Sequence, residues 1–165
     1  MSDDTISSHS DRLACALRLC ERAQLRMTPA RQSILACLAR SRTPTNLDTI
    51  TQADEIRGQC DATTVYRTLM LLKELDVVRQ VSVRHRVRYF VLNVPGEPHD
   101  YLICRCCGSI VGLPHLQTVH DLERKVVTSM GYAGVYHELE IHGICPKCQR
   151  AGKAILPAAK LPITN

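Results

Sequence analysis

The chain has 165 residues, 22% of them charged, and a formal net charge of +5 at pH 7. This length suits one large domain or two small ones, and no apolar run approaches the roughly 20 residues that a membrane-spanning helix needs. One Phe, five Tyr and no Trp leave a core of Leu, Val, Ile and Ala, which favours two small domains, one of them held by a metal ion. The polar N-terminus, with Asp3 and Asp4, lacks the apolar segment of a secretory signal. We therefore expect a cytoplasmic protein with reduced cysteines and no membrane partner.

The positive charge is concentrated in the first part of the chain. Lys and Arg outnumber Asp and Glu by 14 to 10 up to Val94, and by 7 to 6 after it. A basic surface attracts polyanions such as nucleic acids. The first part is therefore the candidate for binding a polyanion.

Three helices are predicted near the N-terminus. Apolar residues at helical spacing begin just after Ser10, which is a candidate N-cap. Thr28-Pro29 is typical of a helix start, and the second helix should run to about Ala39. Asn46 can cap a third helix that Gly58 ends.

A further helix begins after Asp61 and has two different faces. Its apolar residues Val65, Leu69, Leu72 and Leu75 should face inward. Thr63, Thr64, Tyr66 and Arg67 crowd the first two turns on other faces. A helix that enters the major groove of DNA carries its base contacts in these turns.

Residues 77–83 and 87–93 have the period-2 pattern of β-strands and flank the basic segment Arg84-His85-Arg86. Helices followed by a basic hairpin indicate a winged helix-turn-helix, whose wing arginines would lie along phosphates. The alternative is a solvated hairpin of a small α+β domain. We assign residues 1–94 to a winged-helix DNA-binding domain and residues 95–98, with Pro95 and Gly96, to a hinge.

The second domain is predicted to span residues 99–148. Strands at 101–104 and 109–113 should be followed by a helix after Pro114 that Gly131 ends, and by a strand over 135–144. The residues of that helix predicted to face inward are Leu116, Val119, Leu122, Val126 and Met130. Residues 149–165 are expected to form a disordered tail.

Two CxxC motifs predict a closed zinc site in this domain. Its ligands would be Cys104, Cys107, Cys145 and Cys148. Cys106 is also present, but pairing Cys104 with Cys107 matches the spacing of the second motif and lets Gly108 turn the chain close to the metal. Disulfides or a redox CxxC are alternatives, although neither motif lies at the start of a βαβ helix. A site with four protein ligands stabilises the fold and does no chemistry.

Three segments resemble the ferric uptake regulator family of bacterial metal-responsive transcription factors. They are residues 63–69 (TTVYRTL), 99–108 (HDYLICRCCG) and 137–148 (HELEIHGICPKC). The match extends in order and spacing from about Leu19 to Cys148. The resemblance implies an N-terminal winged-helix domain, a C-terminal dimerisation domain and a homodimer on a pseudo-palindromic, A/T-rich operator. It also implies repression of metal-uptake or stress genes when a regulatory metal is bound.

The resemblance assigns DNA-binding roles to particular residues. Tyr66 and Arg67 match base- and phosphate-contacting positions, and Arg26 matches a basic residue that reaches the minor groove. Tyr can pack against a thymine methyl, Arg can donate to guanine or phosphate, and Arg favours a narrow A/T minor groove. The predicted DNA contacts are Arg26, Thr63, Thr64, Tyr66, Arg67, Arg84 and Arg86.

The regulatory metal ligands depart from the family pattern. Where members have His-His-Asp-His before the first knuckle cysteine, this chain has Pro98, His99, Asp100 and Tyr101. Inside the dimerisation domain, Asp100 and His137 keep their places, and His120 stands where a glutamate is common. Asp100, His120 and His137 offer one oxygen and two nitrogens, which suit zinc, iron or manganese. His99 remains from a second family site, between the domains, and completes the predicted regulatory ligands.

Together, these features predict an α+β protein that is not an enzyme, takes no small-molecule substrate and binds double-stranded DNA as a homodimer. Structural zinc and a second divalent ion are the expected cofactors, with the second ion as the signal. Two alternatives stay open. One is a thiol or peroxide sensor that uses Cys106, and the other is a metal-insensitive DNA-binding protein whose zinc is purely structural.

Overall fold

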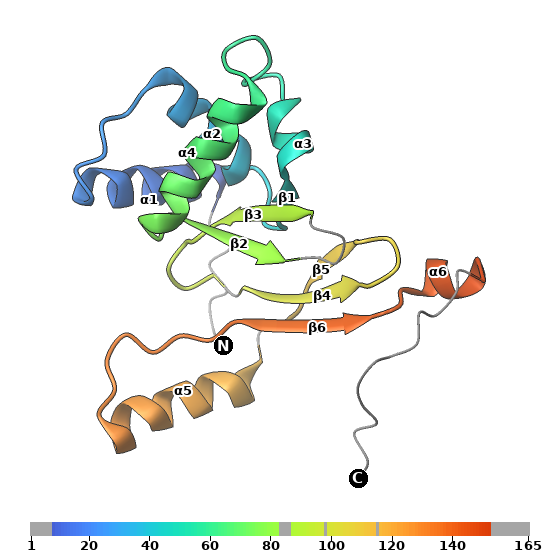
Figure 1. The fold of residues 1–165 in the computed structure, drawn as a ribbon. Coiled ribbons are helices and arrows are strands. Elements are labelled where there is room, and N and C mark those ends of the chain that lie inside the picture. The colour runs from blue at the N-terminus through green and yellow to red at the C-terminus, as the bar shows by residue number, and fades with distance from the viewer. Residues whose placement is uncertain (1–7, 83–86, 98, 115, 153–165) are drawn as a thin grey trace. The chain divides into compact units, whose positions relative to one another are not determined.

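The computed structural model describes residues 8–82, 87–97, 99–114 and 116–152. They form two compact units, the first ending at Glu97 and the second following it. This division falls within the segment 95–98 that the sequence predicts as a hinge. Each unit has its own three-stranded sheet together with helices, so the fold is α+β, as predicted (Figure 1). Within the described ranges, no helix has the length and apolar character needed to cross a membrane.

The first unit combines helices with a small sheet. Its elements are α1 (His9–Arg22), α2 (Pro29–Ala39), β1 (Thr45–Asn46), α3 (Leu47–Thr51), α4 (Ala62–Glu74), β2 (Val78–Ser82) and β3 (Arg88–Leu92). The strand order is β1-β3-β2, and both pairings are antiparallel. Helices followed by the β2–β3 hairpin give the arrangement predicted for a winged helix. The two-residue β1 is too short for a period-2 pattern to show in the sequence.

Side-chain caps decide where the helices of the first unit begin. Thr28, Asn46 and Asp61 each accept a hydrogen bond from the backbone N–H three residues further on, as their residue types predict. The helix α1 begins earlier than predicted. Its N-cap is Ser8 rather than Ser10, because Ser8 and Asp11 form a reciprocal capping box.

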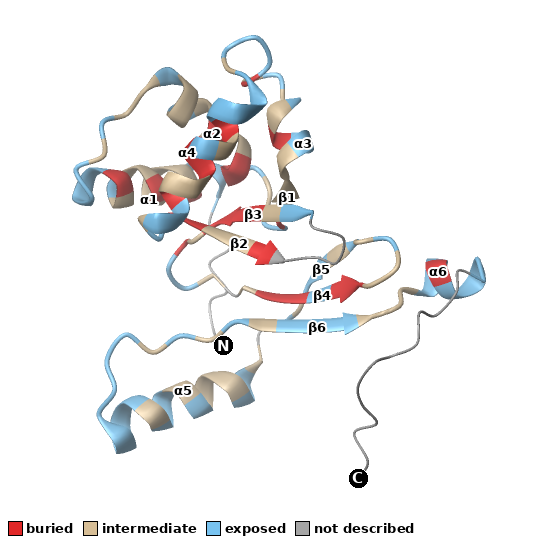
Figure 2. Cartoon of the chain, viewed as in Figure 1, coloured by how far each residue is buried: buried red, intermediate tan, exposed pale blue. Residues whose placement is uncertain are grey.

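An apolar core joins α4 to the sheet of the first unit. Val65, Leu69 and Leu72 of α4 are fully buried, as are Phe90 and Leu92 of β3, and all five belong to one core cluster. Because side chains alternate along a strand, Phe90 and Leu92 share the helix-facing side of β3. Figure 2 shows red, buried residues on these elements, while α4 also carries exposed residues on another face.

The second unit is a smaller sheet with two helices. Its elements are β4 (Asp100–Cys104), β5 (Ile110–Gly112), α5 (Gln117–Met130), β6 (Leu139–Gly143) and α6 (Pro146–Arg150). The strand order is β5-β4-β6, with β4 antiparallel to β5 and parallel to β6. A parallel pair needs a crossover connection, which α5 supplies. The helix α6 extends into the segment predicted as a tail, and residues 153–165 of that segment lie outside the described ranges.

The helix α5 differs from its prediction in one respect. It ends at a left-handed Gly131 as expected, but it contains no buried residue. Leu122 is 60% exposed and Met130 66% exposed, and α5 carries no red in Figure 2. The predicted inward residues Leu116, Val119 and Val126 are half-buried, so the prediction is wrong in a single protomer only for Leu122 and Met130. The described part of the chain leaves this apolar face uncovered.

Candidate functional site

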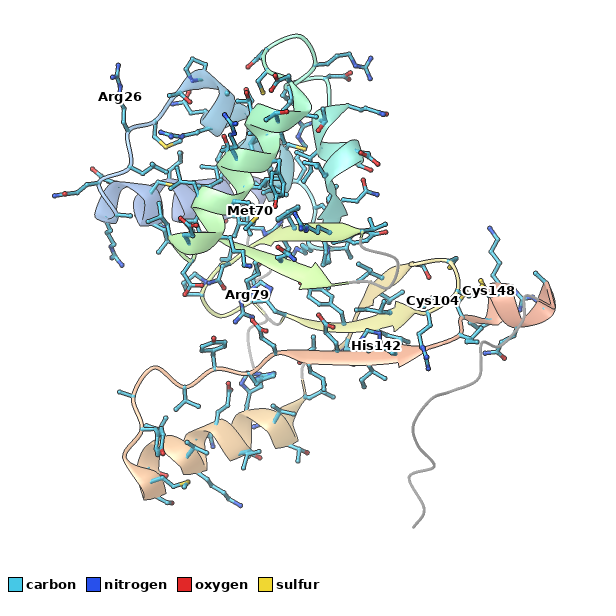
Figure 3. All side chains as sticks on the ribbon, in the orientation of Figure 1. Arg26, Met70, Arg79, Cys104, His142 and Cys148 are labelled. Carbon is cyan, nitrogen blue, oxygen red and sulfur yellow. The ribbon has the colours of Figure 1, made fainter. Side chains whose placement is uncertain are left out.

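Four cysteine sulfurs gather beyond the ends of β4 and β6. They belong to Cys104, Cys107, Cys145 and Cys148, and all lie within 4.8 Å of one another. The sulfurs of Cys107 and Cys145 are 3.8 Å apart, close to the roughly 3.8 Å edge of a tetrahedron with Zn–S bonds of about 2.3 Å. Figure 3 shows Cys104 at the end of β4 near Cys148 of α6. These are the four predicted ligands, and Cys106 is not in the group.

Strand pairing brings the two CxxC motifs together. The register of β4 against β6 places Cys104 opposite Gly143, so Cys145 lies only two residues beyond the last paired residue. The backbone N–H of Cys145 donates to the sulfur of Cys104 at 3.3 Å. Gly108 has a φ of 73°, a left-handed conformation that glycine adopts without steric cost and that lets the first motif turn back.

The thiols have perturbed acidities. Burial raises the pKa of Cys104, but the backbone N–H groups of Cys107, Cys145 and Cys106 lower it to about 6. Burial and the neighbouring thiols raise the pKa of Cys148. Crowded thiols cannot all ionise without a cation, whereas zinc binds thiolates and displaces their protons. The nine cysteines all lie within the described ranges, and none forms a disulfide. The donor set therefore fits structural zinc.

A second group of ionisable side chains is centred on His137. Its Nε2 lies 3.1 Å from an Asp100 carboxylate oxygen, and its Nδ1 lies 2.8 Å from Glu123. Glu123 also lies 3.1 Å from Nδ1 of His120, and the two imidazole rings meet edge to face, 5.3 Å between centres. The structure thus brings three predicted regulatory ligands, Asp100, His120 and His137, into one network.

Glu123 belongs to this network but is not among the predicted ligands. It lies one helical turn after His120 on α5, so both side chains project from the same face. The His120-x-x-Glu123 spacing was the available sequence signal. The fourth predicted ligand, His99, lies beside Tyr101, with its Nδ1 3.3 Å from the phenol oxygen.

Two carboxylates flank the His137 imidazole. Asp100 is only 1% exposed, and a buried carboxylate needs a positive or hydrogen-bonding partner. The hydrogen bond with Glu123 raises the pKa of His137, burial lowers it, and Asp100 raises it again, with a net increase. Two carboxylates and two imidazoles also suit zinc, iron or manganese. In the structure, however, Asp100 and Glu123 contact opposite nitrogens of the His137 ring, so the donor atoms do not converge on one point. Among the described residues, only the four cysteines bring their ligand atoms within 4.8 Å of one another.

The predicted DNA contacts of α4 lie on its exposed side. Thr63, Thr64 and Arg67 are exposed, and Tyr66 is half-buried. The buried face of the helix holds this surface against the core of the first unit. Its first two turns therefore present hydroxyl, phenol and guanidinium groups to solvent.

The remaining predicted contacts lie outside α4. Arg26 is exposed between α1 and α2, and its side chain extends away from the ribbon in Figure 3. The guanidinium of Arg31 donates to the carbonyl of Arg26, which ties this segment to α2. Arg84 and Arg86 lie outside the described residues.

Comparison with known proteins identifies related sequences. Residues 22–142 match the model of the Ferric uptake regulator family. The chain is 30% identical over 128 residues to the peroxide-responsive repressor PerR of Staphylococcus aureus, a match that covers 77% of this chain and 84% of that protein.

Solved structures show the same fold at lower identity. The ferric uptake regulator of Pseudomonas aeruginosa with manganese is 20% identical, with a TM-score of 0.66 over 79% of this chain and 98% of that one. The Helicobacter pylori ferric uptake regulator is also 20% identical, with a TM-score of 0.65 over 87% and 95%. The Campylobacter jejuni peroxide stress regulator is 23% identical, with a TM-score of 0.59 over 80% and 98%. The family match and the S. aureus relative show that the chain belongs to the ferric uptake regulator family of transcriptional regulators.

Proposed function

We propose that this chain is a cytoplasmic, metal-responsive repressor that binds double-stranded DNA as a homodimer. The observation that carries the proposal is the presence of two different donor sets in one small unit. The four cysteines form a closed set that suits permanent zinc. The network around His137 offers oxygen and nitrogen donors that suit an exchangeable divalent ion. A metal-responsive regulator needs both a stable fold and a reversible site.

A second copy of the chain is the partner that the exposed face of α5 fits. Leu122, Val127 and Met130 are exposed on α5, and Tyr132 and Tyr136 follow it. Adjacent exposed apolar side chains of this size indicate a protein interface. The same helix carries His120 and Glu123 of the metal network. Dimerisation and metal binding would therefore depend on one element.

The exposed side of α4 fits the major groove of DNA. A recognition helix places its N-terminal residues against base edges, and Thr63, Thr64 and Arg67 occupy that part of α4. Arg26, which is exposed between α1 and α2, would enter an A/T-rich minor groove. In a symmetric dimer, two such helices would read half-sites about one helical turn apart.

The metal would act by favouring one arrangement of the dimer. When bound, the ion would link α5 to β4 through Asp100 and side chains of the His137 network. The ion would have to replace at least one of the contacts that His137 makes with Asp100 and Glu123 at its opposite nitrogens. A ligand shifts such an equilibrium only by its difference in affinity for the two states. The regulated genes would serve metal uptake or stress responses.

A peroxide response is a second candidate. It is favoured by the identity to the S. aureus peroxide-responsive repressor. A mechanism through Cys106 would use the thiol that lies outside the four-sulfur group but forms a side-chain hydrogen bond with Cys148. A purely structural role for metal is less favoured, because the network around His137 offers a second donor set.

The DNA-binding role of α4 can be tested with Arg67→Ala. We expect a loss of about 1–3 kcal/mol on a palindromic A/T-rich duplex and a much smaller loss on random DNA, because a base contact is sequence-specific. Lys73→Ala, at the exposed C-terminal end of the same helix, is the matched control. Equal losses on both duplexes would assign Arg67 to phosphate. No loss on either duplex would remove α4 from the DNA interface.

A further inference from the structure

Arg88 and Tyr66 connect the β2–β3 hairpin to α4. Nη1 of Arg88, the first residue of β3, donates a hydrogen bond to the Tyr66 hydroxyl. The guanidinium carbon also lies 5.1 Å from the centre of the Tyr66 ring. Tyr66 is half-buried and Arg88 is exposed. The contact therefore lies at the surface, beside the side chains that are predicted to meet DNA.

The alternation of β3 explains why Arg88 reaches α4. Phe90 and Leu92 are buried in the core on the helix-facing side of the strand. Side chains two residues apart share a face, so Arg88 projects to the same side just beyond the core. A planar guanidinium stacks well on an aromatic ring. The local structure thus favours the observed pairing with Tyr66.

This pairing decides which hydrogen-bonding role Tyr66 can offer. A phenol hydroxyl has one hydrogen to donate and can also accept. Arginine remains charged and has only donors, so the Tyr66 oxygen must accept from Arg88. The hydroxyl hydrogen must then point away from the guanidinium. Thymine O4, guanine O6 and N7, and phosphate oxygens can all accept such a hydrogen.

We propose that Arg88 is a positioning residue for Tyr66 in DNA recognition. Arg88 holds the phenol ring of Tyr66 beside the hairpin and orients the Tyr66 hydroxyl as a hydrogen-bond donor in the free protein. A side chain that becomes ordered only on binding reduces affinity. Because Arg88 orders the Tyr66 ring in the free protein, it should tighten operator binding about three- to tenfold. The inference rests on the proposed function, since it needs α4 to be the recognition helix.

A double-mutant cycle tests the coupling. Arg88→Ala should weaken binding to the palindromic duplex about three- to tenfold in the wild-type background and less than about twofold in the Tyr66→Phe background. The slope of log K against log salt should not change, whereas loss of a phosphate contact would reduce its magnitude by about 0.9. Arg22→Ala, at an exposed arginine in the last turn of α1, is the control and should change neither quantity.

A measurement without DNA separates this inference from the proposed function. Relaxation of a ¹³C-labelled Tyr66 ring should show greater mobility in Arg88→Ala than in the wild type, with an unchanged melting temperature. Three results would each overturn the positioning role. They are equal mobility of the Tyr66 ring in Arg88→Ala and wild type, equal affinity losses from Arg88→Ala in the wild-type and Tyr66→Phe backgrounds, and a salt slope of reduced magnitude in Arg88→Ala. If the wild type fails to prefer the palindromic duplex over random DNA, the proposed function fails, and the ring mobility still decides whether Arg88 orders Tyr66.

Discussion

Arg12 and Glu97 form a partly buried ion pair that connects α1 to the last residue of the first unit. Nε of Arg12 lies 3.0 Å from the Glu97 carboxylate, and the two side chains are 2% and 15% exposed. Nη1 of Arg12 also donates to the carbonyls of Ala39 and Ser41, at 2.6 and 2.8 Å. One guanidinium therefore connects α1, the C-terminal end of α2 and the end of the unit.

Removal of this guanidinium should destabilise the first unit strongly. We expect Arg12→Ala to lower the free energy of unfolding by about 3–5 kcal/mol, because a charged partner and buried carbonyls lose their donor. Urea unfolding followed by circular dichroism measures the change. Arg18→Ala, at an exposed position of the same helix, should stay within about 0.5 kcal/mol of wild type. Equal stability of the Arg12 and Arg18 variants would show that the ion pair contributes little.

The four-cysteine group should be required for the fold of the second unit. We expect Cys145→Ser to lose zinc and to unfold this unit, because structural zinc contributes about 10–16 kcal/mol of apparent binding energy. Metal analysis and circular dichroism provide the two readouts. Cys106→Ser removes a neighbouring thiol that is not in the group, so it should retain its zinc. A Cys145→Ser protein that is folded and dimeric would contradict a structural role for the metal.

The stability of protein stripped of its second ion should depend on pH through His137. Its pKa is raised in the fold, compared with about 6.5 in an unfolded chain. Protonated His137 therefore stabilises the fold fully below about pH 6.5, and this contribution is lost as pH rises through the higher folded pKa. The difference in urea midpoint between wild type and His137→Gln should accordingly shrink as pH rises from about 6.5 through the raised pKa of the folded state. His142→Gln, at an exposed position, is the control. If the difference in urea midpoint between wild type and His137→Gln grows with pH, protonated His137 does not stabilise the fold.

The exposed face of α5 should be required for dimerisation. Leu122→Glu combined with Met130→Glu places two charges on side chains that are 60% and 66% exposed in the protomer. We expect a folded monomer, because burial of an unpaired charge at an interface is costly and the protomer does not bury these positions. Thr128→Glu adds a charge to another face of the helix and should remain dimeric. Sedimentation velocity distinguishes a monomer from a dimer. A double variant that stays dimeric would show that this face of α5 is not the dimer interface.

Features encoded by short spacings could be predicted from the sequence. Thr28 and Asp61 are N-caps because their side chains reach the backbone N–H three residues on. The Cys145-x-x-Cys148 motif and its partner likewise depend on a local turn. Such patterns are visible in a sequence because the interacting groups are near one another along the chain.

Features that depend on distant contacts could not be predicted in the same way. The Arg12–Glu97 pair spans 85 positions and Tyr66–Arg88 spans 22, so no local pattern indicates them. Glu123 was missed because a carboxylate on an exposed helix is usually only solvated. The apolar face of α5 was assigned to the interior because helical periodicity shows that a face is apolar but not which chain covers it.

The most direct test of the proposed function combines metal content with DNA binding. Metal per chain would be measured before and after mild chelation, together with affinity for a palindromic A/T-rich duplex at fixed salt, because salt changes affinity strongly. We expect one zinc per chain to resist chelation, and a second, removable ion to restore tight binding in the wild type but not in His137→Ala. If only the resistant zinc is ever present and DNA affinity does not respond to added metal, the metal-responsive function is wrong.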